Sequence, residues 1–305
     1  MSSKRDLISV ADLTPQETGE VVCRALQMKG QGHGHPLKGR RIALLFEKPS
    51  LRTRVSFQVG IHDLGGYSMY LSPQEVGLGS REPVADVARV LSGYVDCIVA
   101  RVFSHQHLVE MARHATVPVI NALSDLEHPC QIISDLLTIA EHKGQLHGLK
   151  LAYIGDGNNV ARSLCLGLPA VGLSFAIASP EGYNLDQAWL KLARSRAING
   201  VEVVAVSSPA EAVRGADIVY TDVWTSMGDE AEAGVRREDF AGYTVDPALL
   251  AQARPDALFM HDMPAHYGEE VAPGMLEHPQ SVAYQQAHNR LHGQKALLEF
   301  LLDGR

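Results

Sequence analysis

The sequence predicts an α/β protein built from two parallel sheets, each wrapped by helices. Short apolar runs alternate with helix-like stretches along the chain, a pattern typical of parallel strands joined by crossover helices. A polar segment at 143–148, Lys-Gly-Gln-Leu-His-Gly, ends one predicted helix and precedes a fresh set of strands. The length of 305 residues and the hydrophobic content of 46% suit two ordinary domains of about 150 residues each.

The first half of the chain opens with a helix and continues as alternating strands and helices. Thr14, Pro15 and Glu17 provide an N-cap, a first-turn proline and a capping-box partner, which predict a helix over 15–28. Strands are expected at 41–46, 67–71, 96–101 and 118–121, with helices at 52–64, 83–92, 105–114 and 129–142.

The second half repeats this alternation. Strands at 150–154, 174–178, 202–206, 218–221 and 257–261 predict a second open parallel sheet. The last helix, over 282–302, is long enough to return to the first domain. We therefore expect a first domain over 1–143 onto which the helix at 282–305 packs back, and a second domain over 144–281.

Composition excludes several classes of protein. An excess of 35 acidic over 27 basic side chains gives a formal charge of -8, which argues against general binding of nucleic acids or anionic membranes. Four cysteines without a CxxC motif indicate free thiols in a reducing compartment: Cys23, Cys97, Cys130 and Cys165. No stretch of about 18 apolar residues and no secretion signal is evident, so a cytoplasmic location is expected.

The segment 46–54, Phe-Glu-Lys-Pro-Ser-Leu-Arg-Thr-Arg, predicts a phosphate site. An apolar strand runs there into a helix start that offers backbone N–H groups, the Ser50 and Thr53 hydroxyls and the Arg52 guanidinium to one anion. The alternative is an ordinary serine N-cap followed by surface arginines.

Polar side chains follow two further strands of the first sheet. Arg101 ends the third strand, and His128 and Gln131 stand between the fourth strand and a helix. Ligands of open α/β sheets bind beyond the carboxyl ends of the strands, so these side chains can face the phosphate segment. The alternative, if each is taken alone, is that the His-Pro dipeptide only caps the helix and that Arg101 is a surface arginine. Arg290 on the last helix could return a guanidinium to the same anion, or lie on the helix surface.

Two strand ends of the second sheet carry carboxylates. Asp222 opens the segment Asp-Val-Trp-Thr-Ser-Met-Gly at 222–228 and can bind an amine, while Ser226 and the following backbone can hold a carboxylate or amino group. The competing interpretation is a helix-capping aspartate and a turn at Gly228. Asp262, within His-Asp-Met-Pro at 261–264, offers a second carboxylate in the same row.

The segment 153–160, Tyr-Ile-Gly-Asp-Gly-Asn-Asn-Val, suggests a rival function. It resembles the strand-turn-helix of dinucleotide-binding proteins, but Val160 replaces the third glycine and no acidic residue ends the next strand. Asn158 and Asn159 at the helix start can equally grip the polar groups of an amino acid. A dinucleotide-dependent oxidoreductase therefore stays as an alternative.

Taken together, these motifs resemble the aspartate/ornithine carbamoyltransferase family over nearly the whole chain. The phosphate segment is similar to the family's Ser-Thr-Arg-Thr-Arg, residues 128–131 to its His-Pro-x-Gln, and residues 222–228 to the Asp-x-x-x-Ser-Met-Gly of its ornithine branch. The resemblance implies two doubly wound domains joined by interdomain helices, with the active site in the cleft. It implies an enzyme that forms L-citrulline and phosphate from carbamoyl phosphate and L-ornithine in arginine biosynthesis, without metal or cofactor, and that assembles as a homotrimer or a multiple of trimers.

The resemblance also implies which residues act. Catalytic roles fall to Arg52, Arg101, His128, Asp222 and Asp262. Carbamoyl phosphate is expected to bind Ser50, Leu51 through its backbone, Arg52, Thr53, Arg101, His128, Gln131, Asp262, Met263 and Arg290. L-Ornithine is expected to bind Asn159, Asp222, Ser226 and Met227.

The chain departs from the family pattern at three positions. Leu51 replaces a threonine but keeps its backbone N–H. Gly77 stands where a neighbouring subunit's loop normally supplies Gln or His, a contact that Gln74 or Arg81 could take over. Asp262 puts a carboxylate where the ornithine branch has a thiol. These departures leave two alternatives open: a carbamoyltransferase for a different amine, and a non-catalytic paralogue that binds carbamoyl phosphate or an amino acid.

Overall fold

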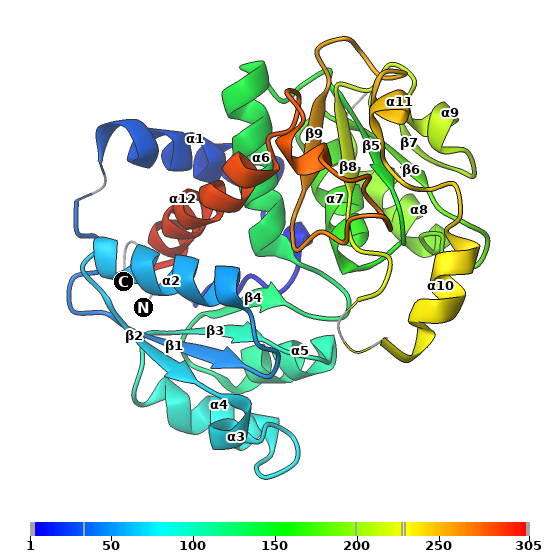
Figure 1. Cartoon of the computed structure of the whole chain (residues 1–305). Coiled ribbons are helices and arrows are strands. Elements are labelled where there is room, and N and C mark those ends of the chain that lie inside the picture. The colour runs from blue at the N-terminus through cyan, green and yellow to red at the C-terminus, as the bar shows by residue number, and fades with distance from the viewer. Residues whose placement is uncertain (1–3, 33, 199, 227, 229, 303–305) are drawn as a thin grey trace. The chain divides into compact units, whose positions relative to one another are not determined.

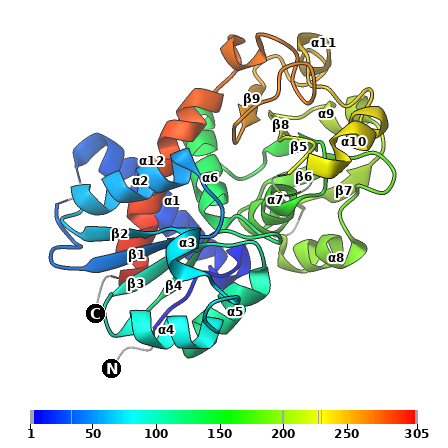
Figure 2. The same ribbon diagram turned by 60° about the horizontal axis from the view of Figure 1, so that its bottom comes forward.

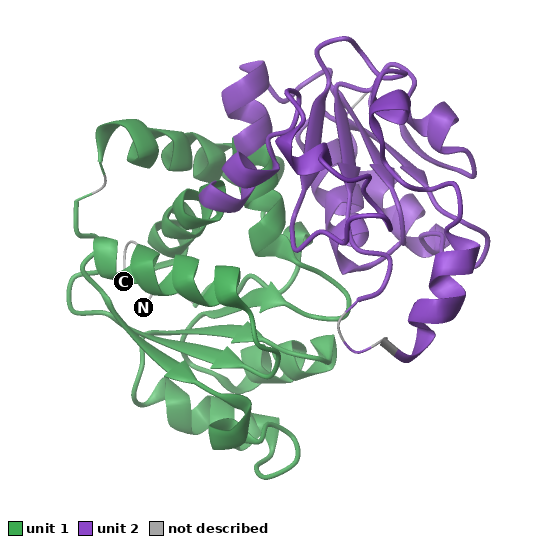
Figure 3. Cartoon of the chain, viewed as in Figure 1, with its two compact units in different colours: residues 1–137, 289–305 green, residues 138–288 purple. Residues whose placement is uncertain are grey.

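The computed structural model describes residues 4–32, 34–198, 200–226, 228 and 230–302. The chain forms two compact units, one of residues 1–137 and 289–305 and one of residues 138–288 (Figure 3). Helices α6 (Pro129–Lys143) and α12 (Ala283–Leu302) each run across the division between the units. The domain boundaries expected from the sequence, at 143/144 and 281/282, therefore fall a few residues from this division.

The first unit contains a four-stranded parallel sheet. Its strands are β1 (Arg41–Phe46), β2 (Tyr67–Leu71), β3 (Cys97–Arg101) and β4 (Val119–Leu123), in the order β2-β1-β3-β4. Strand β1 is buried over five of its six residues, because β2 and β3 pair with its two edges and helices cover its two faces. The predicted alternation of strands and helices is confirmed here.

Helices cover both faces of this sheet (Figures 1 and 2). One face packs against α1 (Pro15–Gln31), α2 (Leu51–Asp63), α6 and α12 through a core that includes Leu44, Phe57 and Leu297. The other packs against α4 (Val84–Ser92) and α5 (His105–His114) through Leu45, Val87 and Leu108. The short helix α3 (Pro73–Val76) follows β2. The capping box predicted from Thr14 and Glu17 begins α1.

The second unit contains a five-stranded parallel sheet. Its strands are β5 (Lys150–Ile154), β6 (Ser174–Ala178), β7 (Val203–Val206), β8 (Ile218–Thr221) and β9 (Leu258–His261), in the order β7-β6-β5-β8-β9. Its helices are α7 (Asn159–Ala170), α8 (Gln187–Arg196), α9 (Pro209–Val213), α10 (Ala233–Asp239) and α11 (Pro247–Leu250). Single 3₁₀ turns lie at Val10–Asp12, Glu230–Glu232 and Met275–Glu277.

Both sheets are doubly wound, which confirms the predicted fold class. In the first sheet the chain moves outward from β1 to β2 and then returns to add β3 and β4 on the other side. In the second sheet β6 and β7 are added in turn on one side of β5, and β8 and β9 are then added on its other side. The crevices at the carboxyl ends of such reversals, between β1 and β3 and between β5 and β8, are where open α/β sheets bind ligands.

The four cysteines are free thiols, as predicted, and all except Cys23 are buried. Within the described part of the chain, no helix combines the length and the apolar character that crossing a bilayer requires.

Candidate active site

In the first unit, the turn between β1 and α2 holds two hydroxyls and a guanidinium together. Ser50 is the N-cap of α2; its hydroxyl oxygen accepts from the Thr53 N–H at 3.3 Å, and its hydroxyl lies 3.0 Å from the Thr53 hydroxyl. Arg290 of α12 donates to the Thr53 Oγ1 at 2.6 Å. Thr53 and Arg290 are both buried. The helix N-terminus and this guanidinium thus form a cationic site suited to an anion.

A neutral imidazole lies beside two guanidiniums in the same unit. Arg101, at the end of β3, and His128, just before α6, are buried. Burial, reinforced by Arg290 and Arg101, lowers the pKa of His128 well below its usual value. His128 is therefore uncharged at neutral pH and can donate a hydrogen bond from one ring nitrogen without adding a charge.

Gln131 adds an oriented amide to this group. Its Nε2 donates to the Asp135 carboxylate at 2.8 Å, one helical turn further along α6, and both side chains are fully buried. Its Oε1 is buried and has no hydrogen-bond partner among the residues that the structure describes. A buried acceptor of this kind is costly unless a ligand N–H completes it.

The remaining predicted residues of the phosphate turn lie at its surface. Leu51 is 76% exposed at the first position of α2, so its backbone rather than its side chain is what the turn offers. Arg52 follows in the same helical turn, with its side chain half-buried.

Gly77, the second departure from the family pattern, adopts the left-handed conformation at φ 55°, which explains a glycine at this position.

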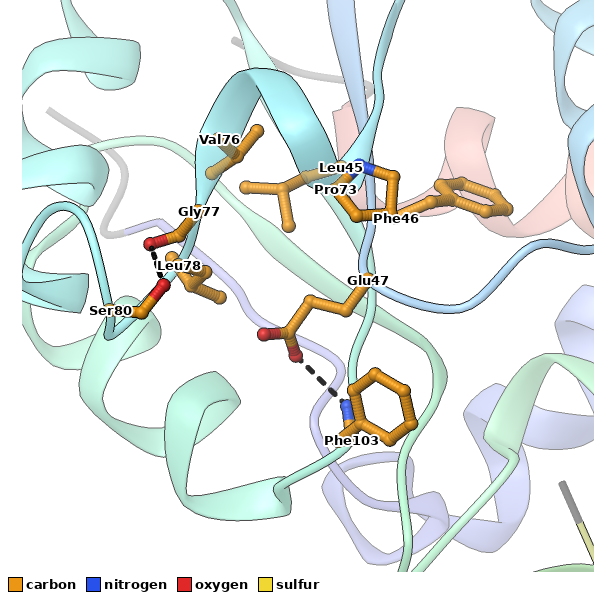
Figure 4. Close-up of a pocket in the computed structure, with 9 residues that line it drawn as sticks. All are labelled: Leu45, Phe46, Glu47, Pro73, Val76, Gly77, Leu78, Ser80 and Phe103. Atoms are coloured by element: carbon orange, nitrogen blue, oxygen red, sulfur yellow. Dashed lines mark hydrogen bonds between the residues drawn. The ribbon is translucent and has the colours of Figure 1, made fainter. Parts of the chain in front are cut away.

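A small pocket in the first unit is lined by residues of three chain segments (Figure 4). Leu45 lies near the end of β1 and Glu47 directly after it, Gly77 lies in the loop after α3, and Phe103 in the segment after β3. Glu47 Oε2 accepts from the Phe103 N–H at 2.9 Å. None of the predicted carbamoyl-phosphate residues lines this pocket.

In the second unit, Asp222 is locked in place at the end of β8. Its Oδ2 accepts from the Asn158 amide at 2.7 Å, and its Oδ1 accepts from the Val223 N–H at 2.7 Å. Asn158 is itself the N-cap of α7, where its Oδ1 accepts from the N–H groups of Val160 and Ala161. Asn158 thus ties Asp222 to the start of α7, and the predicted ornithine residue Asn159 is the first residue of that helix.

A buried histidine–glutamate pair shapes the turn that carries Asp262. His261 Nδ1 accepts from the Met263 N–H at 2.8 Å, so its Nε2 carries the proton and donates to Glu270 Oε1 at 3.1 Å. Glu270 Oε1 also accepts from the His266 N–H at 2.6 Å. His261 and Glu270 are fully buried. This pair holds the segment 261–266 and makes His261 a neutral neighbour of Asp262.

The two carboxylates that the sequence singles out in this unit do lie together. Asp222, His261 and Asp262 each have a side-chain nitrogen or oxygen atom, all within 4.8 Å of one another. Burial, with the charges of Asp222, Asp156 and Asp262, raises the pKa of Tyr153 well above its usual value. The site is therefore strongly acidic and suited to a cation.

A metal ion fits this group less well than an ammonium. Both ring nitrogens of His261 already make hydrogen bonds, so only the two aspartates have coordination capacity left. A second group, His266, Glu269 and Glu270, shares Glu270 with the same hydrogen bonds. Neither group offers the four ligands of a structural zinc site.

The segment that follows Asp222 is anchored from α10. The Arg236 Nη1 donates to the Trp224 carbonyl at 2.8 Å and to Asp156 Oδ2 at 2.7 Å. Ser226 lies two residues beyond this anchor and is half-buried. Met227, the remaining predicted ornithine residue, lies outside the described residues.

Comparisons with known proteins match both units. The model of the aspartate/ornithine carbamoyltransferase carbamoyl-P binding domain matches residues 5–141, and that of the Asp/Orn binding domain matches residues 147–301. The chain belongs to the aspartate/ornithine carbamoyltransferase family. The resemblance recognised in the sequence is thereby confirmed.

Individual relatives lie on the ornithine branch of this family. An ornithine carbamoyltransferase of Methanoculleus marisnigri is 48% identical over 99% of this chain and 98% of its own length. One of Acidothermus cellulolyticus is 51% identical over 98% and 97%. The structure of an ornithine carbamoyltransferase from Pyrococcus furiosus superposes with a TM-score of 0.95 at 45% identity, covering 99% of this chain and 98% of the other.

Proposed function

We propose that this chain transfers the carbamoyl group of carbamoyl phosphate to the side-chain amine of L-ornithine, giving L-citrulline and phosphate. The observation that carries the proposal is the buried Arg290–Thr53 contact at 2.6 Å, which joins a guanidinium to a helix N-terminus beside Arg101 and a neutral His128. An anionic donor suits that site, and the paired carboxylates Asp222 and Asp262 suit an amine acceptor.

On the donor side, each group of the first unit has a distinct task. Arg52, Arg101, Arg290 and the α2 N-terminus neutralise the phosphate as it leaves. His128 and Arg101 donate to the carbamoyl oxygen as it gains negative charge, and Gln131 Oε1 accepts from the carbamoyl N–H₂. Removing one donor to a developing oxyanion typically costs roughly 2.7–4 kcal/mol of transition-state stabilisation.

On the acceptor side, the ammonium must lose a proton before it can attack. Its nitrogen lone pair forms the new bond to the carbamoyl carbon, and the bond from that carbon to the bridging oxygen breaks with its electron pair leaving on phosphate. The second proton of the attacking nitrogen passes to that phosphate, which leaves as hydrogen phosphate. Asp222, already holding two hydrogen bonds, anchors the substrate together with Asn159, Ser226 and Met227. Asp262 accepts the proton, in the place of the thiol found in the family pattern.

We also propose that the enzyme is a homo-oligomer, a trimer or a multiple of trimers. Leu51, Val55 and Val59 lie four residues apart on one face of α2 and are 76%, 47% and 42% exposed. An apolar stripe of this kind supports burial against a second copy of the chain. Light scattering coupled to size exclusion measures the number of copies, and a mass of one chain would contradict the proposal.

The cellular setting is part of the proposal. Four free thiols, three of them buried, support a reducing compartment such as the cytoplasm. The product L-citrulline suits a place in arginine biosynthesis.

The test is release of citrulline and phosphate from carbamoyl phosphate and L-ornithine, beside reactions with putrescine, N-acetylornithine, lysine and aspartate. Turnover with ornithine supports the proposal. Asp262 is the observation that favours a second candidate, transfer to a different amine, and activity with only one of the other amines would select it. No turnover with any amine would favour a non-catalytic binding protein.

A further inference from the structure

Helix α6 carries a buried pair of side chains, of which Gln131 contacts the carbamoyl group in the proposed function and Asp135 does not. Gln131 and Asp135 are four residues apart and therefore lie on the same face of the helix. The Gln131 Nε2 donates to Asp135 Oδ1 at 2.8 Å, and neither side chain is exposed to solvent. Gln131 is thus tied at one end of its amide only.

The identity of its partner decides which end that is. A carboxylate accepts hydrogen bonds and cannot donate one, so the Gln131 N–H₂ must face Asp135. The Gln131 carbonyl oxygen is then turned the other way, buried and without a hydrogen-bond partner among the described residues. An amide orientation that is usually ambiguous is here fixed by the chemistry of the neighbour.

We propose that Asp135 is a positioning residue that sets the specificity for the acyl donor. Because Asp135 holds the Gln131 oxygen on the side of the amide away from itself, the site requires an N–H donor on the acyl group. A carbamoyl phosphate meets this requirement with its N–H₂, whereas an acyl phosphate with a methyl group in that place leaves the Gln131 oxygen buried and unpaired. This inference rests on the proposed carbamoyl-phosphate site.

The experiment compares two stable ligands that differ only at this position, phosphonoacetamide and acetonylphosphonate. Calorimetric titration of the full-length protein gives the ratio of their dissociation constants. We expect the wild type to prefer the amide by about tenfold or more, because an unpaired buried acceptor is penalised in the methyl complex. Inorganic phosphate, titrated in parallel, reports the anion site alone.

Asp135→Asn removes the constraint, since an asparagine can either donate to or accept from the Gln131 amide. We expect the preference to fall below about threefold while the affinity for inorganic phosphate stays unchanged. Asp135→Ser has the same freedom and is expected to behave alike should the asparagine variant not fold. Asp86→Asn on the exposed face of α4 is the matched control and should keep the wild-type ratio.

A second background separates positioning from a general loss of structure. In Gln131→Leu the acceptor is absent, so adding Asp135→Asn should leave the ratio of the two affinities unchanged. An Asp135→Asn or Asp135→Ser protein that keeps the wild-type ratio would overturn the inference, even if the wild type makes citrulline. A wild type that binds neither ligand and makes no citrulline would overturn the proposed function as well.

Discussion

Asp262→Asn is the substitution that separates the two effects a second carboxylate can have on the acceptor amine. An alkylammonium with a reference pKa near 10.4 needs about 4.6 kcal/mol to lose its proton at pH 7, at roughly 1.36 kcal/mol per unit. A carboxylate beside it can accept that proton. The same carboxylate also stabilises the ammonium and so raises the pKa of the bound amine, which slows the reaction.

The geometry supports an ammonium between Asp222 and Asp262. One nitrogen donating at about 2.8 Å to two oxygens along tetrahedral directions requires an oxygen separation of about 4.6 Å. The corresponding atoms of Asp222 and Asp262 lie within 4.8 Å. With a charge separation of about 3.5 Å and an effective dielectric constant of about 20, each carboxylate attracts the ammonium by about 5 kcal/mol before any desolvation cost.

If Asp262 is the proton acceptor, its loss outweighs the easier deprotonation. We then expect Asp262→Asn to reduce kcat by about 10²- to 10⁴-fold, with the KM for carbamoyl phosphate little changed. Asp262→Cys restores a titratable acceptor and should recover part of the activity. The assay is citrulline formation from pH 6 to 10.

The opposite result is equally clear. If Asp262 only stabilises the ammonium, the asparagine variant lowers the pKa of the bound amine, so the rising limb of the pH profile moves to lower pH and kcat at pH 7 increases. That outcome would refute the role of Asp262 as proton acceptor.

Three further predictions concern other parts of the chain. Thr53→Val removes the oxygen that Arg290 contacts at 2.6 Å and should weaken carbamoyl-phosphate binding about tenfold in a competition titration; an unchanged affinity would place the anion elsewhere. The hydrogen bond from Arg5 lowers the pKa of Glu17 to about 2, so the stability that this carboxylate contributes is present above its ordinary pKa of 4.5 and is lost as pH falls toward 2. Urea unfolding should give different free energies of unfolding for wild type and Glu17→Gln at pH 7 and similar ones in acid. A difference that stays constant with pH would contradict this. Burial raises the pKa of the Cys130 and Cys165 thiols to about 12, and Cys97 is buried while Cys23 is exposed. A thiol reagent at pH 8 should therefore modify only Cys23 in the native protein and all four cysteines after unfolding, and modification of a buried thiol in the native protein would contradict this.

The sequence predicts most strands because they are short, mostly apolar runs; β1, β5, β6 and β8 are largely buried, and the edge strand β2 is only partly so. Strands β1, β2, β5, β6 and β8 have the predicted bounds. Strand β4 was expected to end at Asn121, a polar residue, but it continues to Leu123 because the Asn121 side chain is buried and donates to the Ile8 carbonyl at 2.8 Å. Partners distant in sequence decide such a strand end, and no local pattern reports them.

The site was predictable to the extent that its residues sit at strand and helix ends. Asp222 comes directly after β8, and Ser50 caps the helix that follows β1, so both were predicted from the rule that ligands bind at the carboxyl ends of parallel strands. For Arg290 the sequence left two alternatives open, the anion site and the helix surface, because nothing in the sequence of α12 indicates the contact with Thr53. The support behind the site was missed: Asp135 and Glu270 are ordinary acidic residues in the sequence, and only their full burial identifies their roles.

The direction of the pKa shifts gives a separate argument for the ligand of each unit. In the first unit, Arg290 and Arg101 act with burial to lower the pKa of His128, so the local field favours an anion. In the second unit, Asp222, Asp156 and Asp262 act with burial to raise the pKa of Tyr153, so the local field favours a cation. Because the chain carries a net charge of -8, its overall charge cannot account for the positive field in the first unit. That field must come from particular residues. A donor that is anionic and an acceptor that is cationic before reaction match these two fields, whereas a dinucleotide would place its negative pyrophosphate at the α7 N-terminus, beside Asp222.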